Sequence, residues 1–386
     1  MQALQTAMIY REFKDKKISM LGMGLMRLPT VGGDDSVIDE PAAKVMVDRA
    51  FEGGINYFDT AWGYHSGNSE WFIGKALEGY PRDSYYLASK FPGYDLSNFG
   101  HAQEIFEKQL EKCRTEYFDF YLFHNVCELN IESYLQEEKY GTYKYLMEQK
   151  RSGRIRHLGF SVHGTLETTK RFLEAYGKDM EFCQIQLNYV DWNFQAAKQK
   201  VELLREYGID IWVMEPLRGG KLVKLAEEDA AKLKAARPDE TIPAWAFRFV
   251  QSFPDVKVIL SGMSNEQQLL DNLVTFSEER PLSESEMKLL TDIGDEMTKR
   301  TVVPCTACHY CVSHCPQELD IPYLLDLYNE HCFTGSSGFI APMSLGALPE
   351  EKKPSACVGC RSCEAVCPQS IKISEALSDF CVKLGG

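Results

Sequence analysis

Short apolar runs alternate with longer segments of helical periodicity between residues 19 and 276. This alternation is typical of β-α units that build a parallel sheet. The apolar runs that we predict as strands are 20–24, 56–61, 85–90, 118–123, 157–162, 182–187, 211–216 and 256–262. The amphipathic segments that we predict as helices include 43–51, 102–114, 143–150, 166–176, 195–207, 243–250 and 266–276. Eight strands favour a closed (β/α)8 TIM barrel of the α/β class. An open doubly wound sheet is less favoured, because Gly22-Met23-Gly24 lacks the third glycine of its nucleotide-binding turn.

The segments that flank these units differ from them. Residues 1–17 have the pattern of a short β-hairpin lid, and residues 283–297 that of an extra helix in which Ser283 and Glu286 form a capping box. The composition changes at about Arg300, where a cysteine-rich tail begins. A length of 386 residues suits a barrel plus a smaller module. We therefore predict a barrel domain over residues 1–299 and a second domain over residues 300–386.

Composition excludes several classes of function. Hydrophobic residues make up 44% of the chain and charged residues 25%, so a core can be buried. The net charge is -14 and no Lys/Arg block forms a basic stripe, which argues against nucleic acid or a membrane surface as a partner. The chain shows neither a signal-peptide pattern nor a run of 18 apolar residues, so we expect a cytoplasmic protein.

Eight of the thirteen cysteines form two copies of one motif. Each copy has the Cys-x2-Cys-x2-Cys-x3-Cys-Pro spacing of bacterial two-[4Fe-4S] ferredoxins, in which the fourth cysteine binds the other cluster. We therefore predict one cluster on Cys305, Cys308, Cys311 and Cys367, and a second on Cys357, Cys360, Cys363 and Cys315. Two zinc ions are the alternative, but zinc sites do not require the trailing Cys-Pro. The long linker between the motifs, with a helical pattern at 321–330, predicts a mainly α-helical ferredoxin-like domain.

Four polar residues follow predicted strands at the ends where barrel enzymes place their chemistry. Asp59, Lys90 and His124 end the second, third and fourth strands, and Tyr64 lies on the loop after Asp59. A tyrosine with an ordinary pKa near 10 is a poor acid unless a neighbouring cation stabilises its phenolate. Lys90, held charged by Asp59, can supply that cation, and His124 can donate to a substrate oxygen. The four therefore predict reduction of a carbonyl group.

At these positions the chain resembles the aldo/keto reductase superfamily, whose Asp, Tyr, Lys and His tetrad matches in order and approximate spacing. The resemblance spans most of residues 8–276. It implies an oxidoreductase that binds NADPH or NADH across the barrel mouth and interconverts aldehydes or ketones with alcohols. It also implies that Ser161 and Gln184 hold the nicotinamide carboxamide. Met214 stands where a tyrosine often stacks on the nicotinamide, and a methionine can still pack on that ring.

The resemblance extends to the rest of the dinucleotide site. It assigns pyrophosphate binding to a segment that we call the phosphate loop: Leu217, Arg218, Gly219, Gly220 and Lys221. Gly262, Gln268 and Asn272 match the adenosine end. Gly262 and Gln268 replace the lysine and arginine found in strongly NADPH-selective members. The fixed cations for a 2′-phosphate are thus missing, and the resemblance favours NADH at least as much as NADPH.

Two functions remain open at this point. The first is an enzyme in which the two clusters either stabilise the fold or exchange electrons with a flavoprotein or other redox partner. The second is an electron-transfer subunit whose barrel serves mainly as a scaffold. The intact tetrad favours the enzyme. We expect Trp62, Phe91 and Trp192 to line an apolar mouth for a small carbonyl or alcohol substrate.

Overall fold

The computed structural model describes residues 8–299, 302–305, 307–335 and 338–385. The chain divides into two compact units, one of residues 1–126 with 130–290 and one of residues 127–129 with 291–386. Among the described residues, no helix combines the length and the apolar character needed to span a membrane.

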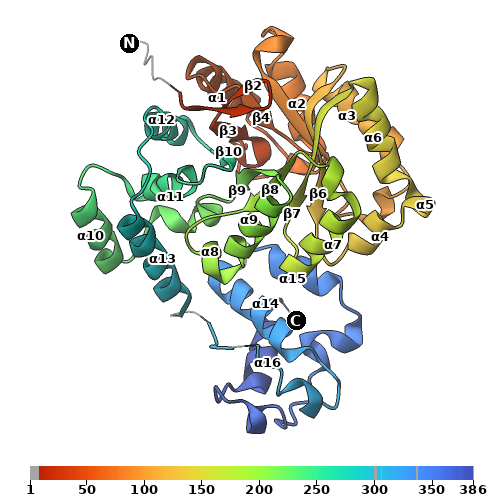
Figure 1. Cartoon of the computed structure of the whole chain (residues 1–386), viewed down its shortest axis with the longest axis vertical. Coiled ribbons are helices and arrows are strands. Elements are labelled where there is room, and N and C mark those ends of the chain that lie inside the picture. The colour runs from red at the N-terminus through yellow and green to blue at the C-terminus, as the bar shows by residue number, and fades with distance from the viewer. Residues whose placement is uncertain (1–7, 300–301, 306, 336–337, 386) are drawn as a thin grey trace. The chain divides into compact units, whose positions relative to one another are not determined.

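Eight parallel strands of the first unit close into a barrel in the order β10-β3-β4-β5-β6-β7-β8-β9 (Figure 1). The strands are β3 (Leu21–Gly24), β4 (Tyr57–Asp59), β5 (Tyr86–Phe91), β6 (Phe118–Val126), β7 (Ile155–Val162), β8 (Phe182–Gln186), β9 (Asp210–Met214) and β10 (Val256–Gly262). Each predicted strand is present with small shifts at its ends, so the predicted (β/α)8 barrel is confirmed.

Helices surround this barrel. They are α1 (Glu40–Glu52), α2 (Asn68–Ala76), α3 (Ala102–Cys113), α4 (Ile131–Leu135), α5 (Glu137–Tyr140), α6 (Thr142–Ser152), α7 (Leu166–Tyr176), α8 (Asp191–Phe194), α9 (Ala197–Glu206), α10 (Glu227–Ala236), α11 (Ile242–Gln251) and α12 (Glu266–Thr275). The sequence pattern does not predict α10, because this helix buries only Asp229 and Leu233 and so lacks an apolar stripe. The sequence pattern does not predict α2 either. In this helix, Gly74 allows a close approach to the backbone of α3.

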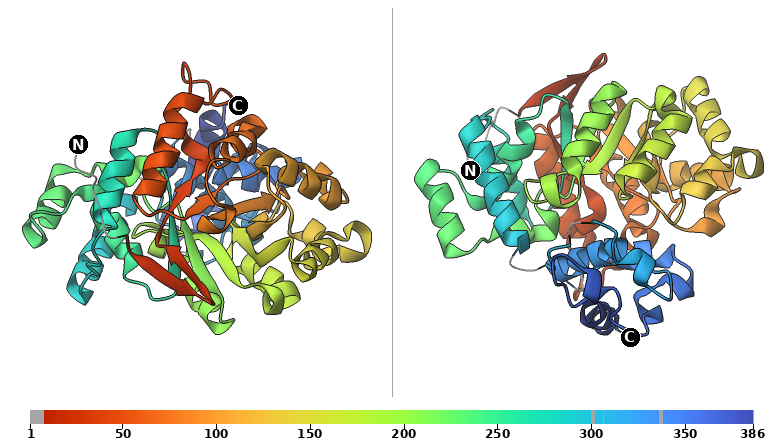
Figure 2. Two further views of the ribbon diagram at one scale, coloured as in Figure 1. Left: turned by 90° about the horizontal axis from the view of Figure 1, so that it is seen from above. Right: turned by 60° about the horizontal axis from the view of Figure 1, so that its bottom comes forward.

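An antiparallel hairpin closes the end of the barrel at which the strands begin. It consists of β1 (Tyr10–Phe13) and β2 (Lys16–Ser19), drawn in red in Figure 2. Phe13 is buried among the first residues of the strands, with ring centroids 5.0 Å from Trp212 and 5.8 Å from Phe120. The predicted hairpin is thus present over its described part, while residues 1–7 lie outside the described residues. The hairpin does not cover the opposite end of the barrel, where the strands finish.

The predicted extra helix is α13 (Glu284–Lys299). Its capping box is reciprocal: Ser283 N donates to Glu286 Oε2 at 2.8 Å, and Glu286 N donates to Ser283 Oγ at 3.3 Å. Two backbone N–H groups at the start of the helix are satisfied in this way.

The tail contains helices α14 (Ile321–Thr334), α15 (Ile340–Gly346) and α16 (Ile373–Lys383). The described residues from 302 onward form no strand, so the predicted mainly helical character is confirmed. The tail has its own apolar core, in which Leu319, Leu324, Leu377 and Phe380 are fully buried.

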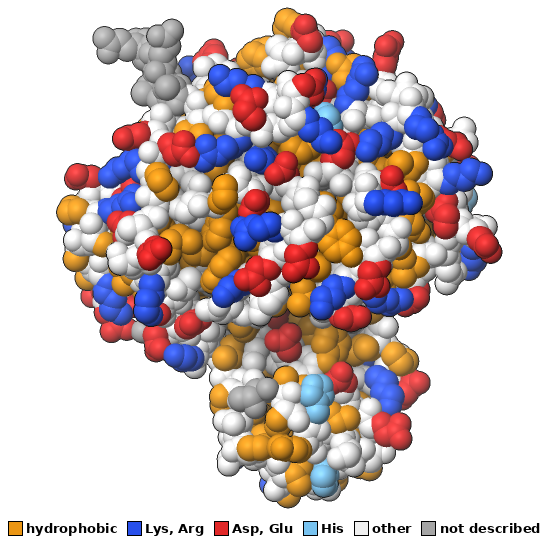
Figure 3. Space-filling view, viewed as in Figure 1, with side chains coloured by type: hydrophobic (Ala, Val, Ile, Leu, Met, Phe, Trp, Pro, Cys, Tyr) orange, Lys and Arg blue, Asp and Glu red, His pale blue; other side chains and the backbone are white. Residues whose placement is uncertain are grey.

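Over the barrel face drawn in Figure 3, acidic and basic side chains are interspersed.

We expect Phe13→Ala to lower the free energy of unfolding by about 3–5 kcal/mol, because it leaves a cavity inside the ring of strands. The measurement is equilibrium unfolding in denaturant. Glu12→Ala is the control, since the Glu12 side chain on the same hairpin is exposed. Equal stability of the two variants would show that Phe13 does not fill the barrel.

Candidate functional site

The structure brings the four predicted catalytic residues together at the open end of the barrel. Asp59 is the last residue of β4, Lys90 stands one residue before the end of β5, and His124 stands two residues before the end of β6. Tyr64 follows on the loop after β4. Because β4, β5 and β6 are consecutive parallel neighbours, their carboxyl ends meet at one edge.

The Lys90 ammonium is the centre of this group. Its Nζ donates to Asp59 Oδ1 at 2.6 Å, to the Thr60 carbonyl oxygen at 2.7 Å and to Tyr64 Oη at 3.4 Å. Lys90 is 0% exposed and Asp59 2%. Burial lowers the pKa of Lys90, but Asp59 and Tyr64 outweigh this effect and leave the pKa above its ordinary value. Lys90 is therefore a buried cation at neutral pH.

Tyr64 and His124 are both neutral beside this cation. Burial raises the pKa of Tyr64, and the charge of Lys90 opposes that rise, so the resting hydroxyl is protonated. Burial lowers the pKa of His124 well below its usual range, and Lys90 adds to the effect. The two rings stand edge-on with centroids 6.1 Å apart. Two neutral hydrogen-bond donors next to a cation suit an oxygen atom that gains negative charge.

The loop that carries Tyr64 has an unusual backbone. His65 and Ser66 have φ values of 51° and 53°, in the left-handed region that residues other than glycine seldom adopt. The buried His65 ring holds the loop in place, because its Nε2 accepts from Leu28 N at 3.2 Å and its Nδ1 donates to the Asp35 carbonyl oxygen at 2.7 Å. No sequence motif marks His65, since both partners come from another segment of the chain.

A buried carboxylate, Glu70, connects this loop to the strand that carries Lys90. Glu70 Oε1 accepts from Ser89 Oγ at 2.6 Å and from Gln109 Nε2 at 2.7 Å. Its other oxygen accepts from Lys112 Nζ at 3.3 Å. Gln109 also donates to the carbonyl oxygen of Lys90 at 3.0 Å. Glu70 lies near the start of α2, so this network joins α2, α3 and β5 behind the catalytic group.

Two predicted cofactor residues stand side by side on neighbouring strands. Ser161 of β7 pairs with Gln184 of β8 in the sheet register. Ser161 Oγ accepts from the backbone N–H of Asn125 at 2.8 Å, and Gln184 Nε2 donates to Met214 Sδ at 3.7 Å. The buried Gln184 Oε1 has no hydrogen-bond partner in the described part of the chain. A buried acceptor without a donor is costly, so these residues fit a ligand that brings an amide N–H, such as a nicotinamide carboxamide.

The phosphate loop forms a tight turn after β9. Gly219 and Gly220 have φ values of 62° and 92°, which favour glycine, and both are exposed. Arg218 is buried instead, and its Nε donates to the carboxylate of Asp191 at 2.9 and 3.1 Å. Arg218 thus fixes the loop to α8, and the exposed cation of the loop is Lys221.

The residues matched to the adenosine end form a second small turn, after β10. Gln268 Oε1 accepts from the backbone N–H of Ser264 at 2.8 Å, which orders the turn. Asn272 Nδ2 donates to Ser261 Oγ at 3.1 Å and lies buried below it. These side chains hold the turn in shape, and Gln268 remains exposed at its surface.

A cation that the sequence pattern does not reveal lies beside Gly262. A Cβ atom on Gly262 would come within 2.8 Å of Arg27 Cγ, so Arg27 packs directly on this glycine. Arg27 is exposed and follows β3, the strand that pairs with β10. The absence of basic residues at 262 and 268 therefore does not leave this end of the mouth without a positive charge.

One of the three aromatic residues expected at the mouth lies elsewhere. Phe91 is 0% exposed, because successive residues of a strand point to opposite faces and Lys90 already points inward. Trp192 packs against Phe253, with ring centroids 4.9 Å apart. Trp62 is half-buried on the loop before Tyr64. The prediction was wrong for Phe91, whose direction depends on register.

The cysteines predicted for the first cluster surround one cavity. Cys305, Cys308, Cys311 and Cys367 line one small pocket together with apolar residues such as Leu325. No group of three or more His, Cys, Asp or Glu side chains in the described residues is spaced to hold a single metal ion. Four thiols around one pocket suit a cubane cluster, which takes four thiolates.

The two cysteine motifs share one backbone. Positive φ values recur at matching positions, at Ala307 and Gly359, at His309 and Arg361, and at Glu318 and Ser370. Left-handed residues of this kind occur in the backbone nests whose N–H groups bind anions and iron-sulfur clusters. The repeat therefore provides two similar sites.

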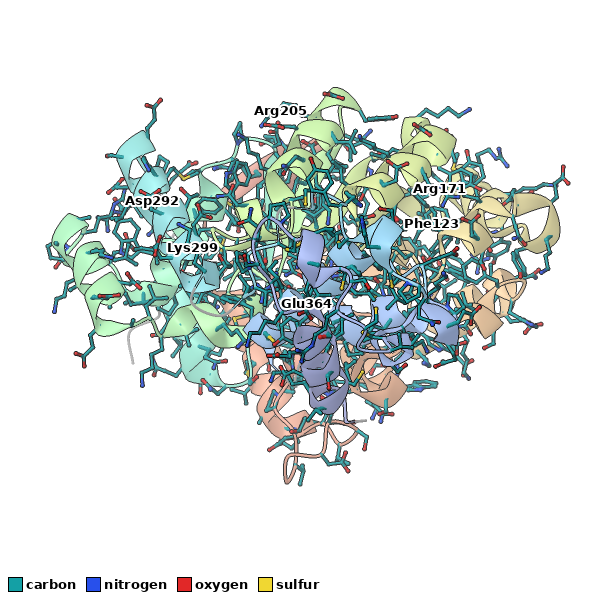
Figure 4. The ribbon with its side chains drawn as sticks, turned by 90° about the horizontal axis from the view of Figure 1, so that it is seen from below. Phe123, Arg171, Arg205, Asp292, Lys299 and Glu364 are labelled. Atoms are coloured by element: carbon teal, nitrogen blue, oxygen red, sulfur yellow. The ribbon has the colours of Figure 1, made fainter. Side chains whose placement is uncertain are left out.

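The second set of cysteines includes one from the first motif. Burial raises the pKa of Cys363 to about 11, and Glu364, Cys357 and Cys315 add to the rise, so Cys315 is a neighbour of Cys363. Glu364, labelled in Figure 4, accepts from Ser374 N at 2.9 Å. This contact ties the second motif to the start of α16. The arrangement agrees with the crossed pattern of ligands.

We expect Glu70→Gln to lower the free energy of unfolding by about 3 kcal/mol, because it leaves the buried Lys112 ammonium without its carboxylate. Glu78→Gln breaks an exposed pair with Arg114 and should change stability by less than about 1 kcal/mol. Equilibrium unfolding of both variants tests this. A similar small change in each would mean that the Glu70 network is not a structural support.

We expect anaerobically prepared protein to contain about eight iron and about eight sulfide per chain. Cys315→Ala should damage the centre built on Cys357, Cys360 and Cys363, because its fourth thiolate is lost. Metal analysis with paramagnetic resonance checks this, and Cys332→Ala, outside both motifs, is the control. Zinc in place of iron, or damage confined to the Cys305 centre, would contradict the assignment.

Comparison with known proteins covers both units. Residues 20–295 match the aldo/keto reductase family, and residues 304–372 match the 4Fe-4S dicluster domain. The uncharacterized oxidoreductase YqkF of Bacillus subtilis is 24% identical over 305 residues, which are 72% of this chain and 92% of that protein. The NADH-specific methylglyoxal reductase of Escherichia coli is 24% identical over 331 residues, covering 74% of this chain and 97% of that protein.

Solved structures show the same fold. The holo form of aldo-keto reductase AKR11C1 from Bacillus halodurans has a TM-score of 0.61 and 26% identity, covering 74% of this chain and 96% of its own. An aldo-keto reductase from Klebsiella pneumoniae in complex with NADPH has a TM-score of 0.57 and 18% identity, covering 75% of this chain and 95% of its own. The family match includes every strand of the barrel. The chain therefore belongs to the aldo/keto reductase family, as an oxidoreductase that carries a C-terminal 4Fe-4S dicluster domain.

Proposed function

We propose that the barrel interconverts a small aldehyde or ketone and the corresponding alcohol, with NADPH or NADH as cofactor. The observation that carries this proposal is the position of Lys90 Nζ, 2.6 Å from Asp59 Oδ1 and 3.4 Å from Tyr64 Oη. It places a protonated phenol next to a fixed cation that stabilises the phenolate.

Each of the four residues has a role in the reduction. When bound, the nicotinamide supplies a hydride to the carbonyl carbon. Tyr64 donates a proton to the carbonyl oxygen, and Lys90 stabilises the phenolate that remains. His124, as a neutral imidazole, donates a hydrogen bond to the same oxygen and stabilises its developing charge. Asp59 keeps Lys90 charged, and in the reverse direction the Tyr64 phenolate accepts the alcohol proton.

The remaining predicted residues form the seat for the dinucleotide. Ser161 and Gln184 Oε1 hold the carboxamide, and Met214 packs on the nicotinamide ring. The backbone N–H groups of the phosphate loop and the cation of Lys221 hold the pyrophosphate. The relative named for NADH-specific reduction of methylglyoxal supports NADH and a small carbonyl substrate. The exposed Arg27 beside Gly262 is a cation that the 2′-phosphate of NADPH can meet.

For the tail, we propose a domain over residues 300–386 that holds two [4Fe-4S] clusters on the crossed cysteine sets. These clusters either pass electrons singly to or from an external redox partner, such as a flavoprotein, or stabilise the domain. The cavity lined by Cys305, Cys308, Cys311 and Cys367 supports the presence of a cluster.

We expect Tyr64→Phe to lower kcat for carbonyl reduction by at least about a hundredfold, because the proton donor is lost. Cofactor affinity should stay within about twofold, because the seat does not use the hydroxyl. Stopped-flow turnover on short aldehydes and ketones, with cofactor binding by fluorescence, tests both points. Tyr207→Phe is the control, since Tyr207 is 41% exposed. Wild-type turnover by Tyr64→Phe would contradict the assignment of the acid.

A further inference from the structure

Tyr94 faces the catalytic group although no motif singles it out. It lies on the connection between β5 and α3, four residues after Lys90. Its ring stands edge-on to the ring of His124 with centroids 5.2 Å apart. It also interacts electrostatically with Tyr64. Tyr94 is only half-buried, so its side chain borders the open mouth of the barrel.

The position of the Tyr94 hydroxyl explains a glycine next to Tyr64. A Cβ atom on Gly63 would lie 2.3 Å from Tyr94 Oη, well inside contact distance. The backbone of Gly63 has φ -93° and ψ -5°, which any residue can adopt. The turn therefore does not require a glycine here. The space above Gly63 is what allows the Tyr94 hydroxyl to reach the loop that carries Tyr64.

The hydroxyl is available to a ligand. Tyr94 Oη makes no hydrogen bond to any described residue, unlike Tyr134, whose hydroxyl donates to the His124 carbonyl oxygen at 2.9 Å. Burial raises the pKa of Tyr94 well above 10, so the group is a neutral donor at physiological pH. A half-buried donor beside the catalytic group is one of the polar groups that can orient a small ligand.

We propose that Tyr94 is a specificity-determining residue, whose hydroxyl binds an oxygen on the carbon next to the substrate carbonyl. This inference rests on the proposed function. When Tyr64 and His124 hold the carbonyl oxygen of a substrate, the carbon next to the carbonyl lies beside the ring of Tyr94. Substrates with an adjacent hydroxyl or oxo group then gain a hydrogen bond that a plain alkyl ketone lacks. Such a bond is worth up to about a tenfold preference.

The test compares two ketones of nearly equal size, hydroxyacetone and butanone, which differ by a hydroxyl in place of a methyl group. The quantity measured is the ratio of their kcat/KM values within each variant, so that a general loss of activity cancels. We expect Tyr94→Phe, which keeps the ring on His124, to lower the hydroxyacetone-to-butanone ratio by about tenfold relative to the wild type. Tyr207→Phe, on the exposed surface, is the control for the substitution type.

A second variant tests the role of the glycine. Gly63→Ala displaces the Tyr94 hydroxyl and should lower the same ratio about as much as Tyr94→Phe does. In the double variant the ratio should fall no further, because the displaced atom is already absent. An unchanged ratio in Tyr94→Phe overturns the inference. So does a Gly63→Ala substitution that lowers the ratio as much in the Tyr94→Phe background as in the wild type. Failure of the wild type to reduce either ketone or any short aldehyde overturns the proposed function instead.

Discussion

The buried ion pair between Lys90 and Asp59 is the interaction on which the barrel site depends. An ammonium without exposed surface costs several kcal/mol unless an anion compensates it, and the 2.6 Å contact with Asp59 provides that anion. The two residues can meet because β4 and β5 are parallel neighbours, in a register that pairs Asp59 with Ala88. Lys90 is the next inward-facing residue on its strand. The strand register therefore fixes the position of the Lys90 ammonium, and the loop after β4 brings Tyr64 next to it.

The two units differ in the number of electrons that their chemistry moves. Hydride transfer moves an electron pair, whereas a [4Fe-4S] cluster ordinarily passes one electron at a time. Exchange between the two kinds of centre requires a carrier of the flavin type, which is why a flavoprotein is the proposed partner. The two cysteine motifs of the tail share positive φ values at matching positions. The side chains at matching positions differ, as His309 and Arg361 do.

Much of the fold could be predicted because it follows from local patterns. The eight strands are buried apolar runs, and the capping box at Ser283 involves residues only three apart. The tetrad could be predicted because three of its members lie at strand ends and Tyr64 lies on the loop after one of them, and a barrel brings these ends together whatever their distance in sequence. The cluster ligands could also be predicted, because the spacing of the cysteines within each motif is a local feature of the sequence. These features need no knowledge of how distant side chains pack.

Features that depend on packing between distant segments could not be predicted. The outward direction of Phe91 follows from the register of β5, which the apolar run alone leaves open. The burial of Arg218 depends on Asp191, which lies in a different β-α connection. His65 and Glu70 support the loop of Tyr64 through partners up to 42 residues away. Each of these residues looks like an ordinary polar or aromatic side chain when its partner is unknown.

Glycines illustrate this limit, because a glycine can be required by a contact with a distant segment that the sequence alone does not show. Gly219 and Gly220 have positive φ values, so local backbone geometry accounts for them. Gly63 and Gly262 do not have positive φ values, and neither position requires a glycine for its backbone. Each instead leaves room for a side chain from another strand connection, Tyr94 in one case and Arg27 in the other. At this barrel mouth, these two glycines of ordinary conformation each mark a close neighbour, and both neighbours are polar groups that a substrate or cofactor can meet.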